Sequence, residues 1–395
     1  MDKRRFTQRY VTLIFIVMFF YGFSTQAVGT LITRIIEHYG IRMAQAGLLS
    51  SFTSAGNFAA IFIITIFVGR INKMLLMGSC LLLYATSLFL VSSMPPFGII
   101  LASFALIGIF GATIDTLTNS LTADLLPENI SRNMSLLHGL FGLGGLSGPV
   151  IIEPLASRYG WAQVYFIISI AFFIYLSVYA VFLVLHRDLL ATRMSHEKQS
   201  QFGFADILRF FTQKRNVLLW LAMFFYGGNQ STLAVWIKRY VETHLNMPAW
   251  GAYTLSAMWL GTAVCRLLIS PNIKASSPKK IFFGNLISAV ILTLGLLSAS
   301  AQGITAASLA VGLSSGLTIP LILAIGCELY REKTAFGTLM PFTALFIAYV
   351  VFPPLSGYVS DSFGIPWGVA LGGISALATA LFSAVLGAAL KSEKA

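Results

Sequence analysis

The chain has 395 residues, of which 57% are hydrophobic and only 10% are charged, and its mean hydropathy is +0.81. This composition excludes an ordinary soluble protein of two or three domains and predicts an integral membrane protein. The net charge of +12 reflects the placement of basic residues on one side of a bilayer, so it does not indicate a nucleic-acid partner.

Twelve apolar runs follow one another along the chain, each long enough to cross a bilayer as a helix. They span residues 11–36, 44–69, 74–93, 97–123, 132–156, 161–185, 217–241, 248–270, 280–299, 304–327, 334–358 and 365–390. Six runs fall in each half. The sequence therefore predicts an all-α membrane protein with twelve transmembrane helices in two pseudo-symmetric halves of six helices, residues 1–186 and 217–395. The polar interval 187–216 is predicted to be a cytoplasmic linker.

The two halves repeat each other. The letters MFFYG begin at Met18 and again at Met223, an offset of 205 residues, and the same offset pairs Arg34 with Arg239 and Pro149 with Pro354. Charged and proline positions agree as well as apolar ones, which is typical of transporters built from two parallel repeats.

Basic residues give the orientation. Of the 26 Lys and Arg residues, 21 fall on the side of the N-terminus when the predicted spans alternate, and the positive-inside rule then places both termini in the cytoplasm. The opening MDKRR could begin a signal peptide, but the apolar run after it is too long and lacks a small-residue cleavage site. We expect a retained first span, a bacterial inner membrane and a monomer.

Motifs of enzymes and metal proteins are missing from the sequence. Cys80, Cys265 and Cys327 lie inside predicted spans without metal-binding spacing, and there is no Walker A, GxSxG or HExxH pattern. We therefore predict no enzyme activity, no catalytic residue, no metal site, no cofactor and no ATP-driven transport.

Asp115 is an acid inside the fourth apolar run, roughly 12 Å from the cytoplasmic end of that helix. An ionisable residue at such depth suggests function, because a carboxyl group there can hold a proton and release it when the site opens to water. Asn119 lies four residues on, on the same helix face, and His138 in the fifth run is expected at similar depth, where it could share the proton. The alternatives are a packing aspartate bonded to Thr113 or Thr118 and a satisfied polar histidine.

Amide and indole side chains are also placed inside the predicted spans. Each amide offers donors and an acceptor, and an aromatic ring can pack on the apolar face of a sugar, so the set suits a neutral polyhydroxyl ligand. Its members are Gln26, Asn57, Asn119, His138, Asn229, Gln230, Trp236 and Trp259. The alternative is that the amides bond helices to one another.

The segment DTLTNSLTADLLPE resembles the fourth-helix signature of the fucose-galactose-glucose:proton symporter family, the fucose permease family of the major facilitator superfamily. The matching positions are Asp115, Thr116, Asn119, Pro127 and Glu128. The segment YGFSTQ resembles the family's first-helix segment, with Gln26 where that family has a carboxylate, and His138 stands where it has an amide. The resemblance implies the twelve-helix fold and proton-coupled sugar transport, with only the fourth-helix acid retained.

Two further patterns concern the direction of transport and the gating. GLGGLSGPVI, with Gly144, Gly148 and Pro149, agrees in part with the glycine-proline motif of proton-coupled drug antiporters. The gate motif of the superfamily is reduced to VGRINK, and the predicted gating residues are Gly69, Arg70, Arg266 and Pro320.

Together these patterns predict a secondary active transporter that works by alternating access. Its expected partners are protons, a small polyhydroxyl solute such as a hexose, and the lipid bilayer. One alternative is a proton-coupled antiporter that exports amphipathic drugs or metabolites. Another is a membrane sensor that binds a ligand without moving it.

Overall fold

A computed structural model describes residues 3–67, 72–126, 128, 130–186, 204–269, 277–331 and 333–392. These residues form helices and connections, without a strand among them. In lipid every backbone polar group must be satisfied within its own segment, which is why long apolar runs fold as helices.

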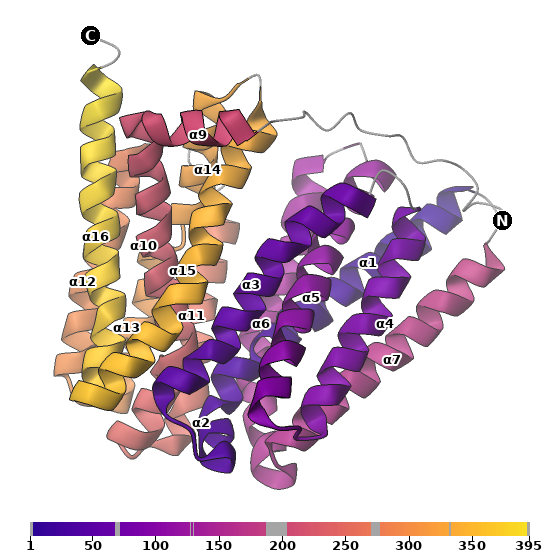
Figure 1. Cartoon of the computed structure of the whole chain (residues 1–395), viewed down its shortest axis with the longest axis horizontal. Helices are drawn as coiled ribbons and strands as arrows, with labels where there is room; N and C mark the ends of the chain where they lie inside the picture. Colours follow the sequence, from indigo (N-terminus) through magenta and orange to yellow (C-terminus); the bar gives the residue numbers. More distant parts are fainter. Residues whose placement is uncertain are drawn as a thin grey trace. The chain divides into compact units, whose positions relative to one another are not determined.

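Each predicted run coincides with one helix or with two consecutive helices (Figure 1). Those before the predicted linker are α1 Lys3–Thr25, α2 Ala27–Tyr39, α3 Met43–Phe67, α4 Lys73–Ser92, α5 Phe97–Leu125, α6 Ile130–Tyr159 and α7 Trp161–Leu185. Those after it are α10 Lys214–Arg239, η1 Tyr240–His244, α11 Pro248–Val264, η2 Cys265–Ile269, α12 Pro278–Leu297, α13 Ala301–Ser315, α14 Thr318–Leu329, α15 Thr334–Phe363 and α16 Ile365–Ser392. Here η1 and η2 are single π-helical turns.

Ten spans in the described part of the chain are long and apolar enough to cross a membrane. The two remaining predicted runs are α3 and α10, helices of 25 and 26 residues. A short helix, α9 (Phe204–Thr212), lies within the predicted linker, and its Phe210 is buried against Phe336 and Met340. The chain is thus helical over nearly all of its described length.

The repeat seen in the sequence is also present in the backbone. Met94, between α4 and α5, has φ 53°, and Ala299, 205 residues later between α12 and α13, has φ 46°. Gly160 joins α6 to α7 with φ 88°, and Gly364 joins α15 to α16 with φ 95°. Positive φ is rare outside glycine, so its recurrence at matched connections shows that the two halves turn in the same way.

Close helix crossings repeat as well. A methyl group at Gly108 of α5 would lie 2.0 Å from the carbonyl oxygen of Thr53 in α3, and one at Gly312 of α13 would lie 2.2 Å from that of Met258 in α11. Small residues let membrane helices approach closely where lipid supplies no hydrophobic drive. Glycine therefore fixes one crossing of the same kind in each half.

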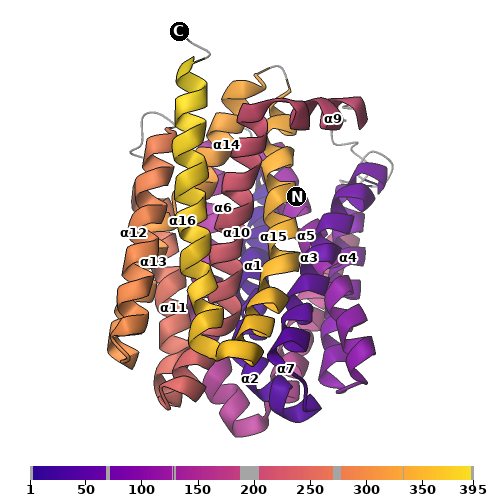
Figure 2. The same ribbon diagram turned by 60° about the vertical axis from the view of Figure 1, so that its left-hand side comes forward.

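The chain forms two compact units by its internal contacts. The first comprises residues 1–39 and 52–197, and the second comprises residues 40–51 and 198–395. In the first unit α1 packs on α6 and α4 packs on α5 and α7. In the second, α10 packs between α15 and α16, as both views show, and α11 packs on α13 (Figure 2).

The start of α3 belongs to the second unit. The backbone N–H groups of Met43 and Ala44 donate to the carboxylate of Asp361, at 3.1 and 2.9 Å, and the Ser51 hydroxyl donates to the carbonyl of Val350 at 2.5 Å. An acid at a helix N-terminus satisfies unpaired N–H groups and the helix dipole. These contacts tie the first turns of α3 to α15.

Candidate functional site

Asp115 lies partly buried near the middle of α5, where it meets side chains from two other helices. The Asn119 amide donates to the carboxylate Oδ1 at 3.2 Å and to the Asp115 carbonyl at 2.8 Å. His138 of α6 and Tyr21 of α1 are close enough to interact electrostatically with the Asp115 carboxyl. The structure thus brings together Asp115, Asn119 and His138, and it adds Tyr21.

The two threonines of the packing alternative bond to the backbone. Thr113 Oγ1 donates to the carbonyl of Ile109 at 2.7 Å, and Thr118 Oγ1 donates to the carbonyl of Asp115 at 2.7 Å. Hydroxyl groups in membrane helices commonly bond to the preceding turn in this way. The carboxylate of Asp115 is therefore held by Asn119 alone among the hydrogen bonds of the described residues.

Tyr21 reaches Asp115 because Gly111, one turn before Asp115 on α5, has no side chain. A methyl group at Gly111 would lie 2.8 Å from the Tyr21 ring and 3.1 Å from the Tyr84 ring. The Tyr84 hydroxyl is 2.7 Å from the Ser24 hydroxyl. Sequence reasoning did not single out Tyr21, although it stands within the repeated MFFYG and so was marked by the repeat itself.

Gln26 packs between the first two helices and α6. It occupies the break between α1 and α2, is 5% exposed, and its amide nitrogen donates to Thr25 Oγ1 at 3.2 Å. Its side-chain carbons would be 2.8 Å from a methyl group at Gly148, and Gly144 similarly accommodates the Phe19 carbonyl. The small residues of the GLGGLSGP run therefore let α6 pack closely on α1. This packing explains the run without an antiport mechanism.

Three of the predicted ligand-binding residues of the second half bond inside their own unit. The Asn229 amide donates to the carbonyl of Gly372 at 2.9 Å, and the Gln230 amide lies 3.5 Å from Ser315 Oγ. Trp236 is fully buried, with its indole N–H donating to the carbonyl of Pro353 at 3.0 Å. These contacts match the alternative interpretation of bonds between helices.

Asn57 and Trp259 behave differently. The Asn57 Oδ1 and the Trp259 Nε1 are buried, and neither has a hydrogen-bond partner among the residues that the structure describes. A buried polar group without a partner is costly. The Asn229 Oδ1 is likewise buried without a hydrogen-bond partner among the described residues, although the nitrogen of the same amide donates to Gly372.

The predicted gating residues are distributed over two regions. Gly69 and Arg70, like Pro127, lie outside the described residues. Arg266 lies in η2, where its Nε donates to the carbonyl of Gly316 at 3.3 Å, in the break between α13 and α14. Pro320 follows in the first turn of α14, a position at which proline's missing N–H costs no helical bond.

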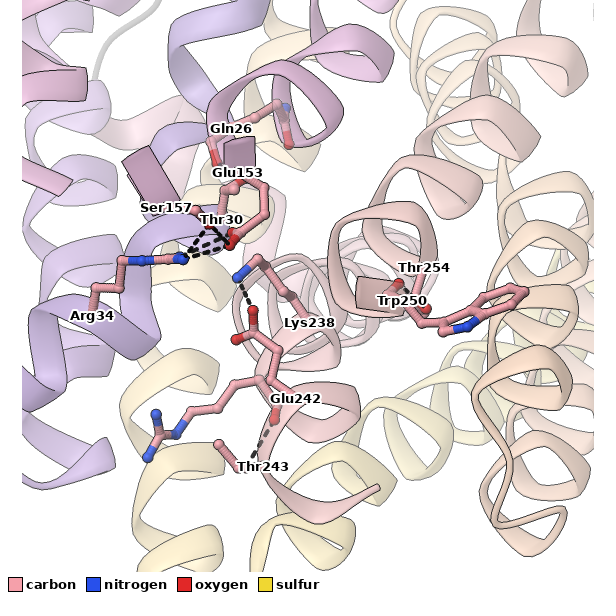
Figure 3. Close-up of polar contacts among 11 residues, drawn as sticks. Gln26, Thr30, Arg34, Glu153, Ser157, Lys238, Glu242, Thr243, Trp250 and Thr254 are labelled. Carbon is pink, nitrogen blue, oxygen red and sulfur yellow. Dashed lines mark hydrogen bonds and ion pairs between the residues drawn. The ribbon is translucent and has the colours of Figure 1, made fainter. Parts of the chain in front are cut away.

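Three ion pairs of the structure were not predicted from the sequence. Lys73, the last residue of VGRINK, contacts Asp124 of the fourth-helix signature at 2.8 Å. Arg34 of α2 contacts Glu153 of α6 at 2.6 Å and donates to Ser157, while in the second unit the buried Lys238 pairs with Glu242 (Figure 3). Opposite charges near the ends of neighbouring apolar runs were the available signal for the first two pairs, and the spacing of four residues was the signal for Lys238 and Glu242.

No metal-binding cluster is formed by the described residues: three or more His, Cys, Asp or Glu side chains do not come together among them. The ionisable groups of the described spans include the ion pairs above and the two separate groups Asp115 and Arg266, which have tyrosine neighbours.

Comparisons with known proteins identify a matching family and solved structures with a similar fold. The model of the Major Facilitator Superfamily matches residues 14–340. Among solved structures, a bacterial homolog of the human lysosomal transporter Spinster, in an inward-facing and unoccupied conformation, has a TM-score of 0.73 at 14% identity over 97% of this chain and 96% of that chain. The E. coli fucose:proton symporter FucP has a TM-score of 0.65 at 16% identity over 96% of this chain and 99% of that chain.

No curated protein gave a significant match to the sequence. The structural likenesses, at 14% and 16% identity, establish the fold. The family model covers most of the chain, from the first helix to α15. This chain is a member of the Major Facilitator Superfamily and an integral membrane transporter.

Proposed function

We propose that the protein is a proton-coupled symporter of a small polyhydroxyl solute, working by alternating access as a monomer in a bacterial inner membrane. The observation that carries the proposal is the setting of Asp115, whose carboxylate accepts from Asn119 and interacts with His138 and Tyr21. Among the described residues, no Lys or Arg interacts with this carboxyl group.

This setting suits a group that gains and loses a proton. A carboxyl group inside a membrane protein is stable in its neutral form and is stable as an anion when a positive group or donors face it. His138 interacts electrostatically with this carboxyl group, and Asn119 donates to its ionised form. Asp115 therefore has both a proton partner and a means of remaining charged.

Hydrogen-bonding atoms without protein partners support a polar solute. The Asn57 carbonyl oxygen can accept from a hydroxyl group and the Trp259 indole can donate to one. The neighbour FucP is a fucose:proton symporter, and the fourth-helix signature resembles that of its family. A hydroxyl group of a solute can satisfy either atom, which supports a polyhydroxyl ligand for the unit concerned.

The test is the pH outside lightly buffered proteoliposomes after addition of solutes from a panel of hexoses, pentoses and their acid derivatives. We expect external alkalinisation with one solute class, because protons enter with it. Asp115→Asn keeps the shape of the side chain but cannot release a proton, so it should abolish the pH change. Glu37→Gln, an exposed acid on α2, is the matched control and should retain it.

Other outcomes separate the alternatives. Acidification on addition of amphipathic cations would replace symport by antiport. Saturable binding without any flux would indicate a sensor. Solute uptake that is equal in the native protein and Asp115→Asn, without pH change, would overturn proton coupling while leaving the transporter in place.

A further inference from the structure

Arg266 is a cation inside a predicted membrane span of the second unit. It lies within the span Pro248–Ile269 and is partly buried. No carboxylate of the described residues forms an ion pair with it; its hydrogen bond goes to the carbonyl of Gly316. A charged side chain in a membrane span is rare and suggests a function.

Two tyrosine hydroxyl groups and the Cys265 thiol lie near Arg266. Tyr226 of α10 is fully buried, and its hydroxyl group has no hydrogen-bond partner among the described residues. Tyr226 and Tyr349 of α15 are both close enough to interact electrostatically with the guanidinium. Tyrosine hydroxyl groups can donate to an anion that also contacts arginine. Three helices of one unit thus present donors at one place.

The backbone at this place is irregular on both sides. Arg266 stands in the π-helical turn Cys265–Ile269, and its Nε contacts Gly316 where α13 ends and α14 has not yet begun. Single π-helical turns inside α-helices are frequent at functional sites. Broken helices in transporters commonly flank the substrate position.

Trp259 gives a second donor on the same helix. It precedes Arg266 by seven residues, two helical turns, so the two side chains share a face at about 10 Å along the axis. Its indole N–H is buried and has no acceptor in the described part of the chain. A ligand that satisfies both would have an anionic end and a hydroxyl end.

We infer that the transported solute is a polyhydroxylated carboxylate, a sugar acid, whose carboxylate binds to Arg266 beside Tyr226 and Tyr349. A guanidinium binds a carboxylate through two parallel hydrogen bonds. One cation among neutral hydroxyl groups matches one negative charge, which favours a carboxylate over a phosphate monoester carrying nearly two. The inference rests on the proposed function and narrows its substrate class.

The repeat supports the same division of roles. Tyr21 and Tyr226 are the same position of MFFYG, 205 residues apart. The first faces the acid Asp115 and the second faces the base Arg266. One half thus holds the group that can carry a proton, and the other holds a fixed cation for an anion.

Binding to the purified protein tests the carboxylate directly. We expect D-glucuronate and D-gluconate to bind at least tenfold more tightly than D-glucose, measured by calorimetry. Arg266→Gln should lose that preference, Arg266→Lys should keep part of it, and Arg331→Gln, an exposed cation of the same unit, should leave it unchanged. Trp259→Phe should weaken the binding of sugar acids and of neutral sugars alike, by a few fold.

Equal binding of glucose and glucuronate by the native protein would overturn the inference. An equal loss of glucose binding and glucuronate binding in Arg266→Gln would also overturn the inference, because that pattern indicates a structural role for the arginine. A preference for sugar phosphates that disappears in Arg266→Gln would also overturn it in favour of a phosphate ligand.

Flux under an imposed membrane potential separates this inference from the proposed function. A monoanion entering with one proton moves no net charge, so an inside-negative potential should leave sugar-acid uptake unchanged. Uptake of a neutral sugar with a proton moves one positive charge and should accelerate. Accelerated uptake of a neutral sugar with alkalinisation would support proton symport and overturn the carboxylate ligand. Uptake of a sugar acid that depends on Arg266 but causes no alkalinisation would support the carboxylate ligand and overturn proton symport.

Discussion

At the scale of single residues, the polar groups of this protein differ in whether their bonds are already made. Asn229 and Trp236 donate to backbone carbonyls of neighbouring helices, so they hold the second unit together. The Asn57 carbonyl oxygen and the Trp259 indole nitrogen have no hydrogen-bond partner among the described residues, and neither does the carbonyl oxygen of Asn229. Residue type alone does not separate these groups, because amides and indoles serve both purposes; their neighbours do.

Tyr21 gives a prediction at this scale. Tyr21→Phe keeps the ring that fills the space at Gly111 but removes the hydroxyl beside Asp115. A polar contact of about 1 kcal/mol corresponds to a fall of about fivefold in proton-coupled uptake, measured at several pH values. Tyr165→Phe, a buried tyrosine of α7 whose hydroxyl has no described partner, should show no such fall; equal effects would contradict the prediction.

At the scale of helices, close crossings depend on glycine rather than on apolar side chains. Gly108 meets the Thr53 carbonyl in the first unit, and Gly312 meets the Met258 carbonyl in the second. The run around Gly148 likewise makes room for Gln26. A glycine motif in such a chain therefore indicates how helices approach before it indicates a transport mechanism.

Two glycines of α5 test this interpretation. Gly108→Ala should lower the thermal unfolding midpoint in detergent, because overpacking costs about 1–3 kcal/mol. Gly98→Ala meets nothing within 4 Å and should leave the midpoint unchanged or raise it slightly, since alanine is the better helix former. Similar midpoints for the two variants would refute the assigned crossing.

At the scale of the whole molecule, one segment of the first half is part of the second unit. Residues 40–51 are attached to α15 through Asp361 and Val350, whereas the remainder of α3 belongs to the first unit. Any movement of one unit against the other must bend α3 or detach this segment. We predict the second of these, that the attachment opens during each transport cycle.

A reversible cross-link tests that cycle. In a protein with Cys80, Cys265 and Cys327 replaced by alanine, Met43→Cys with Asp361→Cys should form a disulfide on oxidation, because the two positions are in contact. Oxidation should stop uptake and a reductant should restore it, while each single cysteine variant should be insensitive. Full uptake by completely cross-linked protein would show that the segment stays attached throughout.

The sequence by itself determined the twelve apolar runs, their helical state and the repeat. The reason is that a long apolar segment in a bilayer satisfies its backbone hydrogen-bonding groups only as a helix. It also identified Asp115 and Asn119, since four residues along a helix bring two side chains onto one face.

Only the tertiary structure decided which side chains face one another. Lipid and protein interior are equally apolar, so a membrane helix carries little amphipathic signal to fix its rotation. The neighbours of Asp115 on α1 and of Arg266 on α10 and α15, the burial of Trp236 and the attachment of residues 40–51 all depend on contacts between helices distant in sequence. Those contacts are fixed by glycine crossings and single polar bonds, which no local pattern of apolar residues encodes.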